Sequence, residues 1–176
     1  AQYAYCGTGT SIKLMEWLYE YAYPSELKVN RDAAYTQSLY KKLVSRLISN
    51  GTTTAQYFGT IDRESCLKLA AIIEKYGARG LIGKVNQDQH SPNPYCENTL
   101  QSIEETDRFI QDVLSMKSDR IRPVITPRFI PNCSGPLLKG LGKLYTKYRD
   151  KPVHIQSHIS ESLDEIQFVS ELYSPQ

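Results

Sequence analysis

The chain has 176 residues, of which 40% are hydrophobic and 23% are charged, a composition typical of a globular protein with a single core. A formal net charge of +2 is too small to indicate a nucleic-acid partner or an anionic membrane surface, and no apolar run approaches the roughly 20 residues of a membrane span. The four cysteines lie far apart without a Cys-x-x-Cys pair, which argues against a zinc ribbon or a disulfide scaffold and makes reduced thiols in the cytoplasm the expectation.

The first predicted element is a helix over 34–49, where Leu39, Leu43 and Leu47 recur at helical spacing ahead of Gly51. Strands and helices then alternate along the rest of the chain. Runs of β-forming residues predict the strands, and apolar residues at helical spacing predict the helices. The expected strands are 51–58, 79–85, 122–129 and 153–160, and the expected helices are 62–76, 102–116, 134–148 and 163–173.

Local signals support two of the helix ends. Ser102 with Glu105 three residues later has the capping-box pattern, which predicts that a helix begins at Ser102. Gly77 follows the helix that we expect to end at Tyr76, where a left-handed residue is favoured.

The alternation of strands and helices predicts an α/β protein with a parallel sheet. Its strands begin about 30 residues apart, which is the size of a βαβ unit. A doubly wound open sheet and an eight-stranded (β/α) barrel both fit this pattern. No strand is followed by the glycine-rich motif of a dinucleotide site or of a phosphate-binding P-loop. The long polar loop over 86–98 would lie at the carboxyl ends of barrel strands, where sites are built.

Residues 153–161 form the stretch richest in potential chemistry. Because strand side chains alternate, His154, Gln156, His158 and Ser160 share one face. Buried polar groups without partners cost about 1–3 kcal/mol each, so an inward face of this kind needs partners. His158 falls at the carboxyl end of the strand, and Glu161 follows three residues later. At that spacing the imidazole could bind a metal ion while the carboxylate moves protons.

A second candidate is the end of the strand at 122–129. Arg128 there offers planar, paired donors to a carbonyl or an anion, and Phe129 could stack on a flat ligand. Gln2 lies in an expected loop and indicates nothing by itself.

Each of these groups also has a purely structural explanation. A histidine on a strand is most often a hydrogen-bonded residue, and Glu161 would be favoured in the first turn of a helix by the helix dipole. Judged alone, Arg128 fits a surface ion pair and Phe129 a core position better than a binding site. The residue pattern by itself leaves these alternatives open.

Taken together, several segments resemble the guanine deaminases of the amidohydrolase superfamily, in order and with matching spacing over nearly the whole chain. Asn-Gly-Thr-Thr-Thr at 50–54 is shared widely in the superfamily, whereas the segments at 126–129 and 154–161 are much more specific. The segments are Gln2-Tyr3, Leu14-Met15-Glu16-Trp17-Leu18, Asn50-Gly51-Thr52-Thr53-Thr54, Gly83-Lys84-Val85, Thr126-Pro127-Arg128-Phe129 and His154-Ile155-Gln156-Ser157-His158-Ile159-Ser160-Glu161.

The resemblance implies a fold, a metal and roles for single residues. The fold would be a partial TIM-like (β/α)8 barrel of the metal-dependent hydrolase type, to which residues 1–176 contribute from the loop after the first strand to about the fifth βα unit. One zinc ion is implied, with His158 as a ligand and the other ligands outside this chain. Glu161 matches the catalytic proton-transfer glutamate. The positions implied to contact the purine are Gln2, Arg128, Phe129, His158, Ile159, Ser160 and Glu161.

The implied activity is hydrolysis of guanine to xanthine and ammonia in the cytoplasm, by a homodimer in the intact family member. Asn86-Gln87 and the region around Asn132-Cys133 depart from the family pattern, at positions to which the resemblance assigns no role. Two alternatives stay open: another amidohydrolase deaminase acting on a purine or a triazine, and a non-catalytic fragment. The chain has neither an initial Met nor a signal peptide, and we expect an internal fragment that is inactive alone.

Overall fold

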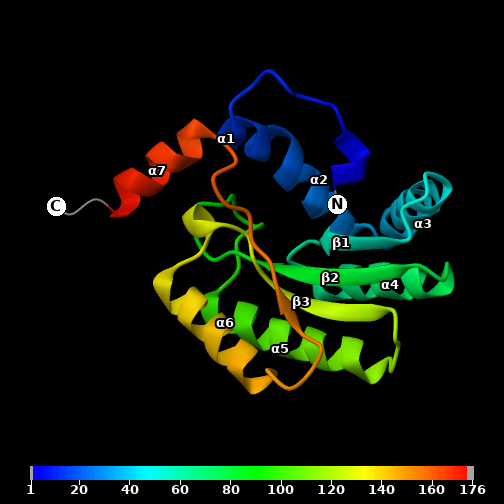
Figure 1. Cartoon of the computed structure of the whole chain (residues 1–176). Coiled ribbons are helices and arrows are strands. Elements are labelled where there is room, and N and C mark those ends of the chain that lie inside the picture. The colour runs from blue at the N-terminus through cyan, green and yellow to red at the C-terminus, as the bar shows by residue number, and fades with distance from the viewer. Residues whose placement is uncertain (1, 174–176) are drawn as a thin grey trace.

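The computed structural model describes residues 2–173 and contains a four-stranded parallel sheet in the order β1-β2-β3-β4 (Figure 1). Helices connect the strands, and a group of helices from η1 to α3 precedes the sheet. The strands are β1 (Thr54–Phe58), β2 (Arg79–Asn86), β3 (Ile121–Pro127) and β4 (His154–Ile155). The helices are η1 (Gln2–Tyr5), α1 (Leu14–Trp17), η2 (Leu18–Ala22), α2 (Tyr23–Arg31), α3 (Ala33–Ser49), α4 (Arg63–Lys75), α5 (Thr99–Ser115), η3 (Ile130–Asn132), α6 (Gly135–Lys147) and α7 (Leu163–Tyr173).

The strand order distinguishes between the two expected architectures. Each strand pairs in parallel with the next one along the chain, from β1 to β4. A doubly wound sheet reverses its strand order at a switch point, whereas the strands of a barrel follow one another around it. Helices α4, α5 and α6 lie on the same side of the sheet (Figure 1). The predicted α/β fold with part of a (β/α) barrel is therefore confirmed.

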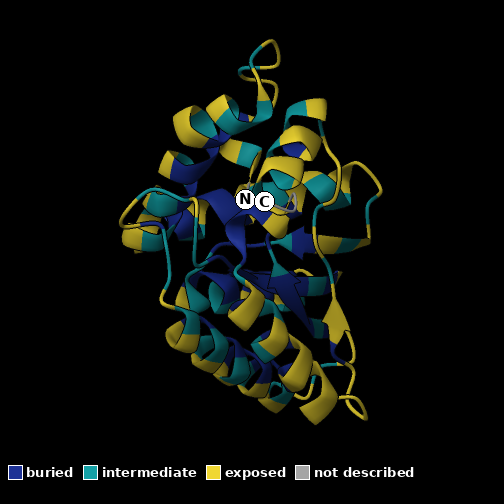
Figure 2. Ribbon diagram, turned by 90° about the vertical axis from the view of Figure 1, so that its left-hand side faces the viewer, coloured by how far each residue is buried: buried dark blue, intermediate teal, exposed yellow. Residues whose placement is uncertain are grey.

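The core fills the space between the sheet and these helices. Tyr57 and Ile82 pair across β1 and β2 and pack with α3 and α4, while Ile125 of β3 packs with α5 and α6. Figure 2 shows the strands mostly buried and the helices exposed on their outer sides. On the other face of the sheet lie Gln56, Phe58 and the side chains that alternate with the core residues. This second face is the inner wall of the incomplete barrel.

Most predicted helix boundaries agree with the structure to within a residue or two. Asp62 caps α4 by accepting from the backbone N–H of Ser65, and Gly77 has a φ of 75°, as its position after a helix requires. The capping box at Ser102 is wrong, because α5 begins at Thr99 and is capped by the side chain of Asn98. Ser102 is instead a fully buried residue inside the helix.

The predicted strand over 153–160 is also too long. Only His154 and Ile155 pair as a strand, although two later backbone contacts continue along β3. The N–H of Gln156 donates to the carbonyl of Ile125, and that of His158 donates to the carbonyl of Arg128, both at 3.0 Å. The loop expected around Gln2 is instead the 3-10 helix η1. The chain after Ile155 therefore follows β3 without forming a regular ladder.

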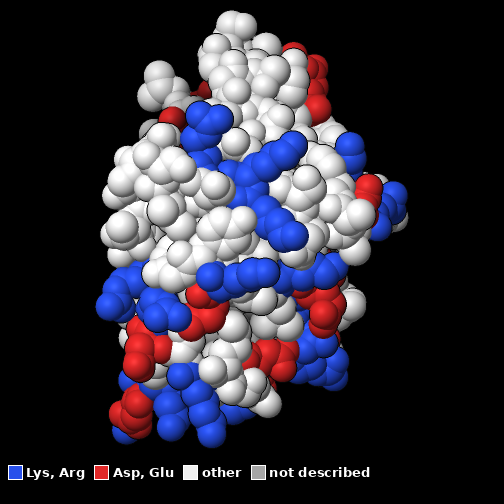
Figure 3. Space-filling model, turned by 90° about the vertical axis from the view of Figure 1, so that its right-hand side faces the viewer, with Lys and Arg blue, Asp and Glu red and all other residues white. Residues whose placement is uncertain are grey.

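Charged side chains of both signs lie on the face shown in Figure 3. Basic side chains gather in the middle of the face shown in Figure 3, and acidic ones lie among them in its lower half. None of the helices among residues 2–173 is long and apolar enough to cross a membrane.

Candidate active site

A cavity of about 500 Å³ lies at the carboxyl ends of the strands, next to η1. It brings together residues from η1, α2, β1 and the ends of β3 and β4. Three of them, Gln2, Arg128 and His158, were selected from the sequence. Its walls include Gln2, Tyr5, Glu26, Phe58, Arg128 and His158.

Arg128 is held in this cavity by a buried ion pair with Glu26 of α2. Its Nη1 donates to Glu26 Oε2 at 2.7 Å and its Nη2 to Oε1 at 3.1 Å. The two side chains are only 3% and 5% exposed. Burial by itself would lower the pKa of Arg128, but the charge of Glu26 and its hydrogen bonds raise it above the ordinary value. The guanidinium is therefore charged and fixed in one orientation.

Three further side chains surround this ion pair. The hydroxyl of Tyr95 donates to Glu26, and the oxygen of Gln87 accepts from Arg128 Nη1 at 3.4 Å. The guanidinium carbon lies 4.9 Å from the centre of the Tyr23 ring, within the range of a cation–π contact. Gln87 is one of the departures from the family pattern. The resemblance assigns it no role, but its side chain contacts Arg128.

His158 lies beside Arg128 at the carboxyl edge of the sheet. Its ring stacks on that of Phe58, the last residue of β1. Burial lowers the pKa of His158. The charge of Glu161 raises this pKa, but the effect of burial is larger. The neutral imidazole is therefore favoured, and this is the form that binds metal ions.

Glu161 belongs to the turn that follows His158. The buried carboxylate of Glu165 in α7 accepts from the N–H of Ser160 at 3.1 Å and from the N–H of Glu161 at 2.7 Å. Ser160 has a φ of 53°, in the left-handed region. The side chain of Glu161 is exposed, and the walls of the cavity do not include it. Glu165 thus anchors the turn, and the charge of Glu161 acts on His158 from outside the cavity.

Three other predicted contact residues, Phe129, Ile159 and Ser160, also lie outside the cavity walls. Phe129 is 2% exposed and packs in an aromatic cluster with Tyr5, Tyr23 and Tyr95. Ile159 is 82% exposed. The structure therefore brings Gln2, Arg128 and His158 together and does not bring Phe129 or Ile159 to the same walls.

Sequence reasoning missed Glu26 and Tyr5. Glu26 follows Tyr23-Pro24-Ser25 in a segment for which no helix was predicted, although Pro24 near the start of α2 was an available signal. Tyr5 lines the cavity, and its buried hydroxyl has no hydrogen-bond partner among residues 2–173. Burial raises the pKa of Tyr5, with a further increase from the charge of Glu26. Tyr5 is therefore neutral, and its hydroxyl is not engaged by the described part of the chain.

A layer of polar side chains crosses the inner wall next to the cavity. Gln156 Nε2 donates to the carbonyl of Tyr57 at 3.1 Å and to Thr126 Oγ1 at 3.0 Å, and Gln156 Oε1 accepts from Gln56 at 2.7 Å. The side chain passes over Gly83 of β2, where a Cβ would lie 2.3 Å from Gln156 Nε2. Gln156 therefore links the end of β4 to β1 and β3.

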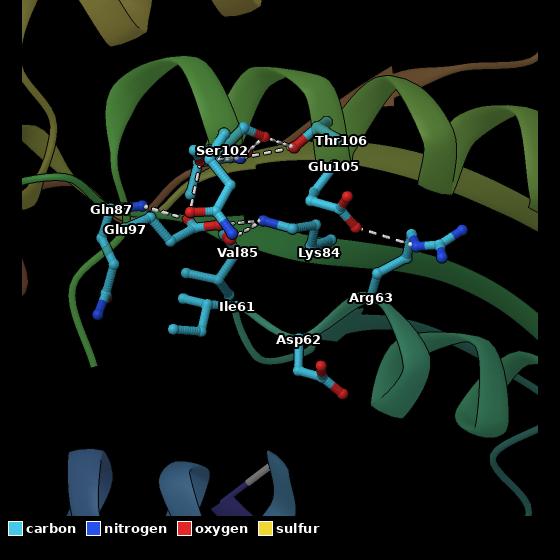
Figure 4. A network of polar contacts seen from close by, with 12 residues as sticks. Ile61, Asp62, Arg63, Lys84, Val85, Gln87, Glu97, Ser102, Glu105 and Thr106 are labelled. Atoms are coloured by element: carbon cyan, nitrogen blue, oxygen red, sulfur yellow. Dashed lines mark hydrogen bonds and ion pairs between the residues drawn. The ribbon is translucent and has the colours of Figure 1, made fainter. Parts of the chain in front are cut away.

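A second buried ion pair lies on the helix side of β2 (Figure 4). Lys84 Nζ donates to Glu97 Oε1 at 2.6 Å, with the side chains 1% and 9% exposed. The other oxygen of Glu97 accepts from Ser102 at 2.8 Å. This pair fastens the loop after β2 to α5 and does not line the cavity of Arg128.

No group of three or more His, Cys, Asp or Glu side chains among residues 2–173 is arranged to hold a metal ion. His158 supplies a single imidazole in the cavity wall. A metal site here would need further ligands from outside the described residues.

The arginine and the histidine at the carboxyl ends of neighbouring parallel strands define the class, an α/β-barrel protein with its site at the carboxyl rim. The sequence profile of the Amidohydrolase family matches residues 3–174, and the chain belongs to this family.

Its relatives include guanine deaminases. The chain is 42% identical to guanine deaminases from Dictyostelium discoideum and Homo sapiens, and the matches cover 98% of this chain and 37% of theirs. The crystal structure of guanine deaminase from C. acetobutylicum, with guanine bound in its active site, is 40% identical and has a TM-score of 0.91. That match covers 98% of this chain and 40% of the other. The chain thus spans well under half the length of the relatives that it matches.

Proposed function

We propose that the complete protein containing this chain hydrolyses guanine to xanthine and ammonia. The observation that supports this most is the meeting of Gln2, Arg128 and His158 in one cavity. Similarity to guanine deaminases over 98% of the chain supports guanine as the substrate. The numbering of the βα units within the complete barrel, the homodimer and the cytoplasmic location stay predictions.

Arg128 and Gln2 would bind the purine. Arg128 has a fixed orientation and a full charge, so its donors can meet the ring carbonyl of guanine without first being ordered. Adenine has an amino group where guanine has that carbonyl, and a donor facing Arg128 would be rejected. Ile159 and Ser160, in the turn beside His158, would contribute contacts at the rim. The predicted stacking of Phe129 would require it to leave its aromatic cluster.

His158 fits the role of a metal ligand, because its imidazole lies in the cavity wall and its burial favours the neutral form. A bound zinc ion supplies the Lewis acidity that makes hydroxide available near neutral pH. The remaining ligands would lie outside the described residues. Phe58 and the backbone contact from His158 to Arg128 would set the direction of the imidazole.

Glu161 would move the protons of the reaction. Water adds to the amino-bearing carbon of guanine, a proton passes to the ring nitrogen, and the amine leaves as ammonia after protonation. The carboxylate of Glu161, three residues after His158, is suited to carry these protons. For this role the exposed side chain of Glu161 must rotate towards the cavity. Its backbone would stay in place during this rotation, because Glu165 accepts hydrogen bonds from the N–H groups of Ser160 and Glu161.

The test is the complete protein with Arg128→Ala and Arg128→Lys. Removing one preorganised donor from such a site costs about 100-fold or more, so we expect at least that loss of xanthine formation with Arg128→Ala. Arg128→Lys keeps a charge for Glu26 but lacks the planar pair of donors, and we expect a large loss there as well. Unchanged guanine turnover in folded Arg128→Lys would rule out the role assigned to Arg128, whereas a wild-type protein that does not turn over guanine would favour the alternative of a different purine or triazine substrate.

The chain of 176 residues by itself should be inactive. With His158 as the one proposed ligand, we expect neither tight zinc binding nor xanthine formation. Metal analysis of the purified chain together with a xanthine assay measures both. Activity of the isolated chain would contradict the assignment of the other ligands to residues outside it.

A further inference from the structure

The guanidinium of Arg128 has two edges, and the protein occupies only one of them. Glu26 accepts from Nη1 and from Nη2, and Gln87 accepts from Nη1 at 3.4 Å. Arginine has five N–H groups, so Nε–H and the second N–H of Nη2 are left. Neither has a hydrogen-bond partner within residues 2–173. Since Arg128 lines the cavity, this free edge is available to a ligand there.

The free edge has a defined chemical complement. Nε–H and Nη2–H are parallel donors, and they match two neighbouring acceptors on a planar ligand. The carbonyl oxygen O6 and the ring nitrogen N7 of a guanine base form such a pair, and arginine binds them in this way in nucleic-acid complexes. A purine without the carbonyl offers only the ring nitrogen.

We propose that Glu26 is a positioning residue that sets substrate specificity. By occupying the Nη1–Nη2 edge, it presents the Nε–Nη2 edge of Arg128 to the carbonyl and ring nitrogen of a 6-oxopurine. This inference rests on the proposed function and extends it to a residue that touches Arg128 rather than the reacting atoms.

The position of Glu26 is itself determined by its neighbours. It lies in α2, far from Arg128 in the sequence, and its carboxylate also accepts from the Tyr95 hydroxyl. Tyr95 is 1% exposed, and its oxygen accepts from the N–H of Ile61 at 3.4 Å. The carboxylate therefore cannot follow Arg128 if the guanidinium rotates, because Tyr95 holds it in place.

The test is Glu26→Gln in the complete protein, with Lys84→Met as the matched control. Both changes disrupt a deeply buried ion pair, but only Glu26 contacts Arg128. The probes are hypoxanthine and purine, which differ by the carbonyl and have no amino group to release. Their inhibition constants against guanine turnover measure how strongly the carbonyl is preferred.

In the wild type hypoxanthine should bind more tightly than purine. Glu26→Gln should reduce that preference by about tenfold, since a bidentate arginine contact gives discrimination of this order. It should also raise KM for guanine more than it lowers kcat. Lys84→Met should lower the melting temperature while leaving the ratio of inhibition constants unchanged. An unchanged ratio in folded Glu26→Gln overturns the proposal.

If Glu26→Gln does not fold, Tyr95→Phe is the variant that tests the proposal. It removes one hydrogen bond to Glu26 and keeps both charges, and a shift of about threefold in the same ratio is expected. An unchanged ratio in Tyr95→Phe then overturns the proposal. A wild type that does not turn over guanine would refute the proposed function instead, and thermal shifts with the same two purines would still measure the preference for the carbonyl.

Discussion

Phe58 and His158 stack face to face, with ring centroids 3.9 Å apart and planes 10° apart. Phe58 ends β1, and His158 follows β4, so the stack joins the two outer strands of the sheet across its inner wall. It leaves the imidazole little freedom to rotate out of this plane.

The stack predicts that Phe58 sets the metal affinity of the complete protein. Residues that orient a metal-binding histidine typically contribute about 10–100-fold to affinity. Phe58→Ala should therefore weaken zinc binding by about tenfold, whereas Phe58→Tyr keeps the flat ring and should stay close to wild type. Titration with a competing chelator measures both. Equal zinc affinity in all three proteins would contradict an orienting role for Phe58.

Gly83 is predicted to tolerate no side chain. A Cβ there would lie 1.9 Å from Thr126 Oγ1 and 2.3 Å from Gln156 Nε2. Gly83→Ala must displace the polar layer and should destabilise the fold by about 1–3 kcal/mol, the usual cost of overpacking.

Gly142 in α6 is the matched control, because a Cβ there meets nothing within 4 Å. Gly142→Ala should stabilise the protein by up to about 1 kcal/mol through its helix preference. Urea unfolding of the three purified proteins gives the comparison. A Gly83→Ala protein as stable as wild type would show that Gln156 does not hold its place over β2.

The cysteines should differ in their reactivity. Burial raises the pKa of Cys66 to about 11 and that of Cys133 to about 12, so both are protonated at pH 8 and shielded from reagents. Cys6 is exposed. We expect iodoacetamide to label Cys6 in the native protein and to label Cys66 and Cys133 only after unfolding, as measured by peptide mass spectrometry. Native labelling of Cys66 at the rate of Cys6 would contradict this.

Local pattern was enough to predict the regular part of the fold. The helix predicted over 163–173 is α7, and the strand predicted over 79–85 differs from β2 by one residue, because periodicity and turn residues are local properties. The rim positions of Arg128 and His158 followed from where their strands end. Side-chain alternation predicts that His154, Gln156 and His158 lie on one face. His154 pairs with Val124 of β3, and the side chain of Gln156 contacts Thr126, two residues further along the same strand.

The contacts that determine the site could not be predicted in the same way. Glu26 pairs with a residue 102 positions along the chain, and no local pattern specifies such a partner. The strand predicted over 153–160 is too long, because β-forming residues indicate a strand whether or not a neighbouring strand is there to pair with them. After Ile155 the chain makes only isolated backbone hydrogen bonds along β3. At Ser160 the backbone N–H donates to Glu165 instead.

The outer edge of β4 has a consequence for how the cavity is completed. β4 pairs with β3 on one side, and on its other side no strand among residues 2–173 pairs with it. In a closed barrel that edge is occupied, and the occupying strand lies beside the segment that leads to His158. A strand that pairs with this edge would therefore also form a wall of the cavity that holds Arg128 and His158, so that closure of the barrel and completion of the cavity become a single event.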